Sequence, residues 1–169
     1  MTMILKHLML TLTLLISSIT QANSLDPSLI HWLNQTIPAI LSFSFKDQPT
    51  TYWKPYQKHF SKQGWSSFTL ALQHANTIKM IQSYQLSPII QLIPHHATNL
   101  HNTPSSLHLK IPAKITYASE NKAIIQKALI EIQLSSKAPF LIDALILQHQ
   151  GSSKIIKIPP RGCALRTLP

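Results

Sequence analysis

Residues 43–72 read FSFKDQPTTYWKPYQKHFSKQGWSSFTLAL, and the spacing of the aromatic side chains in this stretch decides the fold of the chain. The first three residues predict a short apolar strand, and Asp47 to Thr51 predict a turn. An amphipathic segment then runs to Phe60. Because Gly64 tolerates a left-handed backbone where one helix stops and the next begins, the stretch predicts two helices joined at a glycine corner.

The residues before this stretch predict an amphipathic helix. Asp26 and Pro27 are typical of an N-cap followed by the first residue of a helix. The apolar residues that recur at helical spacing after them are Leu29, Ile30, Leu33, Ile37, Ile40 and Leu41, with Trp32 beside this face. We therefore expect one helix to enter the aromatic stretch from its N-terminal side.

The residues after Gly64 predict a further helix and then a sheet. Trp65 to Tyr84 keep a helical period and predict one long helix, which ends before Ser87 and Pro88. Four apolar or alternating runs then predict strands at 89–93, 107–117, 123–134 and 140–149. The short turns between these runs predict antiparallel pairing.

The run at 107–117 is the best defined of the predicted strands. Its odd-numbered residues are apolar or aromatic and its even-numbered residues are polar except for Pro112, which predicts one buried and one wet face. Because proline cannot donate a hydrogen bond to a ladder, Pro112 predicts an edge position or a bulge. Helices followed by antiparallel strands predict an α+β domain, with the long helix packed across a sheet of about four strands.

The first 22 residues have the pattern of a signal peptide. Lys6 gives a weakly basic start, residues 8–16 form an apolar run, and residues 20–22 offer a small-x-small cleavage site. The run is shorter than the roughly 20 residues needed to cross a bilayer, which favours cleavage after Ala22 over an uncleaved leader anchored in the inner membrane. The expected organisation is a signal peptide at 1–22, a periplasmic α+β domain at 23–150 and a basic, loosely ordered tail at 151–169.

The charge balance is strongly basic. The sequence has 15 Lys and Arg against 5 Asp and Glu, a formal net charge of +10. A positive field favours acidic partners and anionic surfaces but carries no information about fold. The lysines are dispersed, and no RNA-binding or helix-turn-helix signature is present, so we do not expect nucleic-acid binding.

The carboxylates give little support for catalysis. Asp26 is expected to cap a helix and Asp47 to stabilise a turn. Asp143 alone lies in an apolar run, where it could line a pocket with His149 as its partner. No second carboxylate or nucleophile completes an acid–base pair, so we do not expect an enzyme.

Four histidines, His95, His96, His101 and His108, fall within a short span. A zinc site requires three or four ligands in tetrahedral geometry, normally on rigid elements. Three of the four lie in a predicted loop, and no cysteine or carboxylate joins them, so we expect neither a metal nor a cofactor. Cys163, the only cysteine, cannot form an internal disulfide.

The aromatic stretch, together with the later strand LHLKIPAKITYAS, resembles the DotI/IcmL/TraM family, whose members are inner-membrane components of type IV secretion and conjugation machines. The likeness runs from about Phe43 to about His149. The residues that carry it are Phe43, Phe45, Phe60, Gly64, Trp65, Phe68, Leu72, Pro112 and Tyr117. The resemblance implies a periplasmic domain of the nuclear-transport-factor-2-like, or cystatin-like, kind, in which a strongly bent antiparallel sheet wraps around helices.

Typical members carry a cytoplasmic segment and a full transmembrane helix before this domain, whereas here only the short leader precedes it. The resemblance therefore covers the periplasmic domain alone. It implies a non-catalytic protein–protein interaction module associated with a Dot/Icm-like type IV secretion system. Its partners would be other secretion-system proteins, in a homo- or hetero-oligomer.

Three aromatic residues are candidates for an exposed contact with such a partner. Trp32, Trp53 and Tyr56 stand among polar and basic residues, and exposed aromatic side chains of this kind are often interface hot spots. The alternative function is a small-ligand binder or an enzyme that uses the hollow of the bent sheet, lined by Asp143 and the strand faces.

Overall fold

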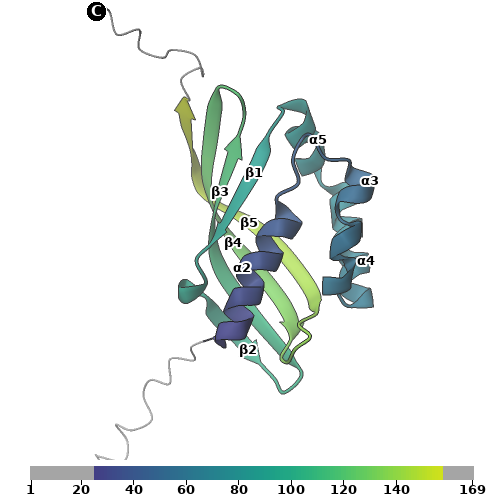
Figure 1. Cartoon of the computed structure of the whole chain (residues 1–169). Coiled ribbons are helices and arrows are strands. Elements are labelled where there is room, and N and C mark those ends of the chain that lie inside the picture. The colour runs from purple at the N-terminus through teal and green to yellow at the C-terminus, as the bar shows by residue number, and fades with distance from the viewer. Residues whose placement is uncertain (1–24, 158–169) are drawn as a thin grey trace, which may run out of the picture.

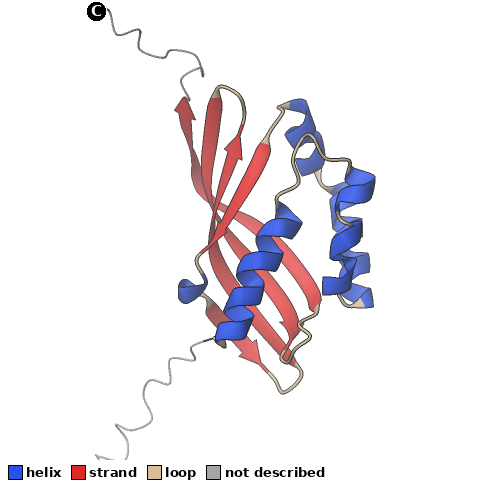
Figure 2. Cartoon of the chain, in the orientation of Figure 1, coloured by secondary structure: helices blue, strands red, loops and turns tan. Residues whose placement is uncertain are grey.

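Five antiparallel strands form one sheet in the described part of the chain, and the larger helices lie on one of its faces (Figures 1 and 2). The computed structural model describes residues 25–157. The helices are α2 (Pro27–Leu41), α3 (Pro49–Tyr52), α4 (Lys62–His74) and α5 (Asn76–Ser83), with the 3-10 helices η1 (Lys54–His59) and η2 (Pro94–His96). The strands are β1 (Ser87–Leu92), β2 (Thr98–Asn102), β3 (Ser106–Ala118), β4 (Lys122–Ser135) and β5 (Ile142–Lys157). The predicted α+β class is confirmed, and the sheet gains β2 where the sequence predicted a loop.

The sheet is built around β3. This strand pairs with β4 along its whole length, from Ser106–Ser135 to Ala118–Ala123. Along its other side, β2 pairs with residues 107–110 and β1 with residues 113–118. β3 is therefore an interior strand of the sheet, with two short strands placed end to end beside it.

Pro112 lies at the gap between those two short strands. β1 has already ended and β2 has not yet begun at this position, so the ladder requires no N–H from residue 112. The carbonyl oxygen of Pro112 still accepts a hydrogen bond of 2.9 Å from the backbone N–H of Ile93. Neither the predicted edge position nor the predicted bulge is present at Pro112, because β3 keeps its register with β4 and the proline is accommodated by an interruption in the strands on its other side.

α2 begins with the predicted cap and crosses the face of the sheet (Figure 1). The Asp26 Oδ1 atom accepts a hydrogen bond of 2.8 Å from the backbone N–H of Ser28, and Pro27 opens the first turn. The side chains between α2 and the sheet that are completely shielded from solvent form what we name the packed core: Leu33, Ile37, Ile40, Leu109, Ile111, Ile130, Ile132, Leu134 and Ile142. This cluster anchors α2 to β3, β4 and the start of β5.

The aromatic stretch is built differently from its prediction. Residues 43–45 do not form a strand but enter a turn in which Asp47 Oδ2 accepts a hydrogen bond of 2.7 Å from Ser44 N–H. α3 and η1 follow, and Ser61, the residue directly after the predicted amphipathic segment, is the N-cap of α4. Gly64 therefore lies in the first turn of α4 and not at a corner between helices.

Gly64 is needed because α4 lies directly against β5. A Cβ atom at this position would overlap the carbonyl oxygen of Ile142 and would lie 3.0 Å from the Cα atom of Asp143. Hydrogen bonds fix the same contact, from Ser61 N–H to the Ile142 carbonyl at 3.0 Å and from Gly64 N–H to Ser61 Oγ at 3.1 Å. The missing side chain is thus what allows the helix to approach the strand.

Two predicted boundaries also differ from the structure. The long helix predicted at 65–84 is divided into α4 and α5, because Ala75 has an extended backbone with φ −77° and ψ 125°. β5 continues to Lys157, so the loose tail predicted from residue 151 is wrong for residues 151–157. The remainder of that tail and the predicted signal peptide at 1–22 lie outside the described residues.

Candidate functional site

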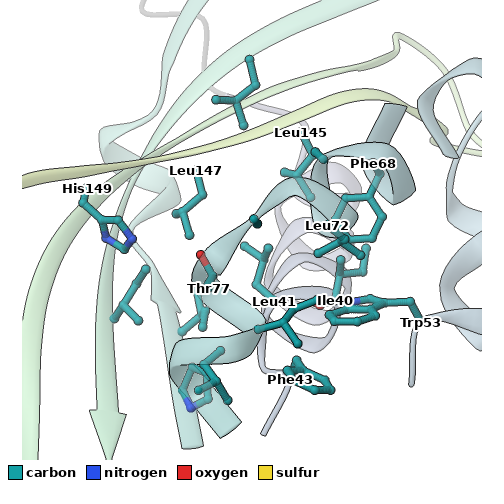
Figure 3. A pocket seen from close by; sticks show the side chains of 18 of the residues that line it. Ile40, Leu41, Phe43, Trp53, Phe68, Leu72, Thr77, Leu145, Leu147 and His149 are labelled. Carbon is teal, nitrogen blue, oxygen red and sulfur yellow. Dashed lines mark hydrogen bonds between the residues drawn. The ribbon is translucent and has the colours of Figure 1, made fainter. Parts of the chain in front are cut away.

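A pocket of about 400 Å³ lies where α4 and α5 stand over the sheet next to the end of α2 (Figure 3). Its walls come from α2, α4, α5, the aromatic stretch and strands β1, β3 and β5. The lining residues are Ile40, Leu41, Phe43, Trp53, Phe68, Ala71, Leu72, Ala75, Thr77, Ile78, Ile81, Pro88, Ile90, Ile115, Tyr117, Leu145, Ile146, Leu147 and His149. All but three of these side chains are apolar, counting Thr77, Tyr117 and His149 as the polar ones.

The break between α4 and α5 is the reason that this space exists. Past Ala75 the chain changes direction, and of the eight residues of α5 only Ile81 is buried. Leu72 and Ile78, on either side of the break, are half-buried. A second hollow of about 430 Å³ lies on the other side of the same break and shares Trp53, Leu72, Ala75 and Ile78 with the first. The helices around Ala75 are therefore loosely packed.

Trp53 forms one wall of both hollows. Its side chain is only 7% exposed, and its ring stacks on Phe43 with 4.7 Å between ring centroids. The indole N–H donates a hydrogen bond of 2.9 Å to the backbone carbonyl of Ile40, a group at the C-terminal end of α2 that has no partner within the helix. The predicted exposure of Trp53 is therefore wrong, because the indole closes the end of α2 instead of facing solvent.

The strand wall of the pocket is a continuation of the core face of the sheet. On β5, Leu145 lies opposite Ile132 and Leu147 opposite Ile130, so these leucines point to the same face as the packed core. Both leucines are nevertheless half-buried. The helices cover the core face completely beneath α2 but only in part beneath α4 and α5.

The polar groups of the pocket are few and lie away from its aromatic wall. In Figure 3, His149 stands at one end, Trp53 and Phe68 at the other, and Thr77 between them. Tyr117 is buried beside His149, with 6.3 Å between the ring centroids. Burial raises the pKa of Tyr117, so its hydroxyl keeps its proton and can donate a hydrogen bond.

The pocket does not bring together Asp143 and His149, which the alternative function placed side by side in its lining. Asp143 is not among the lining residues, and it precedes His149 by six residues on the same strand, a separation of roughly 20 Å. No other Asp or Glu lines the pocket. The prediction that Asp143 lines such a pocket with His149 is wrong, and the lining supplies apolar surface and hydrogen-bond donors.

The histidines of the predicted loop form two separate pairs. His95 and His96 are neighbours in η2, with ring centroids 5.3 Å apart, whereas His101 and His108 face each other across β2 and β3. Within residues 25–157, no group of three or more His, Cys, Asp or Glu side chains is placed to hold a metal ion. Cys163 lies outside the described residues.

The structure brings most of the aromatic residues of the sequence pattern together around the start of α4. Phe60 stacks on Phe68 with 4.9 Å between centroids, and Trp65 meets the edge of Phe60 at 5.5 Å. Of the remaining pattern residues, Phe43, Gly64 and Tyr117 are buried, and Phe45, Leu72 and Pro112 are half-buried. These side chains build the interior that supports the pocket.

Trp32 and Tyr56 are both half-buried and partly accessible to a partner. Trp32 packs between His59 and Phe140, with ring centroids 6.1 Å and 5.6 Å away. Tyr56 contacts Tyr52, whose hydroxyl donates a hydrogen bond of 2.6 Å to the Ala39 carbonyl. The three predicted contact residues do not form one patch, since Trp53 is internal.

Sequence reasoning missed most of the pocket, including Thr77, Ile90 and Leu147. Helical periodicity continues through Ala75, so nothing in the pattern indicated the break that opens the space. One signal was present: on β5, His149 continues the core-facing series of Leu145 and Leu147. A polar residue in such a series marks the place where the helices no longer cover the sheet.

Three solved structures share this fold. An IcmL-like type IV secretion system protein from Legionella pneumophila matches with a TM-score of 0.64 and 18% identity, over 75% of this chain and 95% of that chain. The periplasmic domain of DotI matches with a TM-score of 0.62 and 18% identity, over 77% of this chain and 97% of that chain. A periplasmic fragment of TraM matches with a TM-score of 0.59 and 12% identity, over 75% of this chain and 100% of that fragment.

Comparison of sequences adds no further relative, since no protein-family model and no curated protein matches. In the part of the chain that the structure describes, no helix is long and apolar enough to cross a membrane. The resemblance inferred from the aromatic stretch is confirmed at the level of the fold. The chain has the fold of the IcmL-like protein and of the periplasmic domains of DotI and TraM.

Proposed function

We propose that this chain is a non-catalytic periplasmic interaction module associated with a type IV, Dot/Icm-like secretion system. The observation that carries the proposal is the extent of the structural match. It takes in 95% or more of each of three chains, one named as an IcmL-like type IV secretion system protein and two as periplasmic pieces of DotI and TraM. Such a module would act through contacts with other components of the apparatus.

The periplasmic location rests on the leader and on the neighbours together. Residues 1–22 have the pattern of a signal peptide, and two of the three similar structures are named as periplasmic. N-terminal sequencing of protein recovered from the cell envelope tests this part. A mature N-terminus after Ala22 supports export, and an intact leader in the membrane fraction supports the uncleaved alternative.

Trp32 and Tyr56 are the side chains that we propose for contact with a partner. Both rings are half-buried and so keep accessible surface, and each is held by neighbouring aromatic groups. A rigid, partly exposed ring offers a large contact area at a small cost in conformational entropy.

Crosslinking in the native host tests the association. A photoreactive amino acid at His31, which is exposed next to Trp32 on α2, should capture a component of the secretion apparatus. The same group at Tyr84, which is 65% exposed at the end of α5, serves as the matched control. Capture of no secretion component from either position, in cells where the protein is exported and folded, would contradict the proposal.

A further inference from the structure

We propose that the pocket beneath α4 and α5 binds the acyl chain of a single-chain amphiphile, with the oxygen atoms of its head group at the His149 end. The inference does not depend on association with a secretion system, because it rests on the pocket alone. It assigns a ligand class to a site that the interaction role does not use.

The size of the pocket fits one chain. Its volume of about 400 Å³ lies in the range of roughly 300–1,000 Å³ that is usual for small-molecule sites. The core-facing side chains of β5 line it from Leu145 to His149, four residues of extended strand or roughly 13 Å. The space therefore extends along the strand over about this length.

The polarity of the walls fits a chain with one polar end. Aromatic and aliphatic side chains form the end at Phe68, Trp53 and Ile40, where no polar side chain lines the wall (Figure 3). Tyr117 and His149 stand at the opposite end, and His149 is exposed. A hydrocarbon chain would occupy the apolar end while its head group reached solvent beside these two residues.

The head group is inferred from the hydrogen-bond donors among the lining residues. The Tyr117 and Thr77 hydroxyls and the His149 ring can donate hydrogen bonds, and no carboxylate lines the pocket to attract a cation. A carboxylate or ester oxygen is complementary to such donors. Free fatty acids and lysolipids share this chemistry, and the experiment below separates them from an intact bilayer.

The space is a partly open hollow and not a flat surface. Its lining comes from three helices, the aromatic stretch and strands β1, β3 and β5, so a bound chain would contact protein on more than one side. Unoccupied apolar walls that open to solvent leave hydrocarbon in contact with water, and an acyl chain relieves that contact.

The test is a chain-length series on the purified protein. Hexanoate, octanoate, decanoate and dodecanoate, each below its micellar concentration, are titrated by calorimetry with Trp emission as a second readout. Affinity should rise about fourfold for each added methylene until the pocket is full, and then level off. Absence of binding by every member, or an affinity independent of chain length, would overturn the proposal.

A pair of variants on neighbouring helix positions locates the site. Ala71→Trp places a large ring in the pocket, since Ala71 lines it, and should weaken dodecanoate binding by about tenfold or more. Leu70→Trp is the matched control, because Leu70 is 56% exposed and lines neither hollow, and it should bind as the unmodified protein does. Equal weakening in both folded variants would overturn the assignment. Thr77→Phe, on the facing helix, replaces Ala71→Trp if that variant does not fold.

The head group and the source of the chain are tested separately. Tyr117→Phe should weaken dodecanoate severalfold more than it weakens dodecane-thiol, which lacks an oxygen acceptor, and equal effects on both would remove the head-group assignment. Phosphatidylcholine vesicles supply the bilayer arm. Binding to vesicles without binding to monomeric dodecanoate would overturn the proposal. Binding of monomeric dodecanoate that is not reduced when vesicles are added would support it.

Discussion

The half of the sheet beneath α2 and the half beneath α4 and α5 are covered to different degrees. Beneath α2, the nine side chains of the packed core are completely shielded from solvent. Beneath α4 and α5, Leu145 and Leu147 point to the same face but are half-buried, and a pocket of about 400 Å³ separates them from the helices. The contrast shows one domain in which a rigid scaffold and a loosely covered site share a sheet.

The largest effect should come from truncating the packed core. Ile132→Ala should lower the free energy of unfolding by about 4 kcal/mol, because the vacated space is enclosed on all sides and cannot fill with water. Ile78→Ala, in the pocket wall, should cost about 1 kcal/mol, since its neighbours already face open space. Urea denaturation of both variants measures the difference. Equal losses would mean that the two halves are packed alike.

Gly64 offers the next largest effect and tests the junction between the halves. Gly64→Ala should cost about 2–3 kcal/mol, because the new methyl group overlaps the Ile142 carbonyl and pushes α4 away from β5. Gln63→Ala is the control, an exposed change one residue away on the same helix. A Gly64→Ala variant as stable as that control would show that α4 does not lie against the strand.

Trp53→Phe should have an intermediate effect. The substitution keeps most of the ring but leaves the Ile40 carbonyl without its donor, at a cost of about 1–2 kcal/mol. Trp65→Phe replaces a half-buried ring of α4 and should cost less, because the contacts of this ring with Phe60 and Phe68 are largely retained. Thermal unfolding of the pair gives the order, and a reversed order would contradict the placement of the indole.

The alternation of buried and exposed residues along the strands could be predicted from the sequence. Which strand faces and edges other elements would cover could not. The odd residues of β3 from Leu107 to Tyr117 are all buried, as their pattern predicted, because period-two spacing reports which face of a strand is apolar. The residues 98–102 lack such alternation and become a strand only because β3 offers an open edge beside them. Local patterns cannot report a partner that is supplied by another segment.

Gly64 in the aromatic stretch also shows that local sequence patterns do not reveal contacts with distant segments. Its rings do gather around α4, but Gly64 is there because of a backbone group of β5, nearly eighty residues later in the sequence. Trp53 was assigned to the surface because its sequence neighbours are polar, whereas the end of α2 buries it. The pocket was missed for a similar reason, since the break at Ala75 does not interrupt the helical period.

A small stabilising effect should come from filling the loosely covered half. Ala71→Leu adds apolar volume where space exists, and we expect a gain of about 0.5–1 kcal/mol. Ser67→Leu is the control and should be close to neutral, because Ser67 is exposed and lines neither hollow. Differential scanning calorimetry compares the two. A loss of stability in Ala71→Leu alone would mean that the pocket is already filled.

The smallest effect concerns the start of α2. Hydrogen bonds from Ser28 lower the pKa of Asp26 below 3.8, the ordinary value for an aspartate side chain. Because the folded pKa is the lower one, the carboxylate contributes its stability in full above pH 3.8 and loses it as the pH falls through the folded pKa. The advantage of the unmodified chain over Asp26→Ala should therefore be constant near neutral pH and shrink in acid. A constant advantage down to the lowest pH would contradict the capping role.

Native-state hydrogen exchange tests most directly the claim that the helices shield the packed core completely and the pocket region only in part. The backbone amides of β3 and β4 next to the packed core should exchange only through global unfolding, whereas those of α5 should exchange through local openings that need much less free energy. Dodecanoate should slow exchange in α5 and leave β3 and β4 unchanged. Uniform protection across α5, β3 and β4 in the free protein would contradict the account.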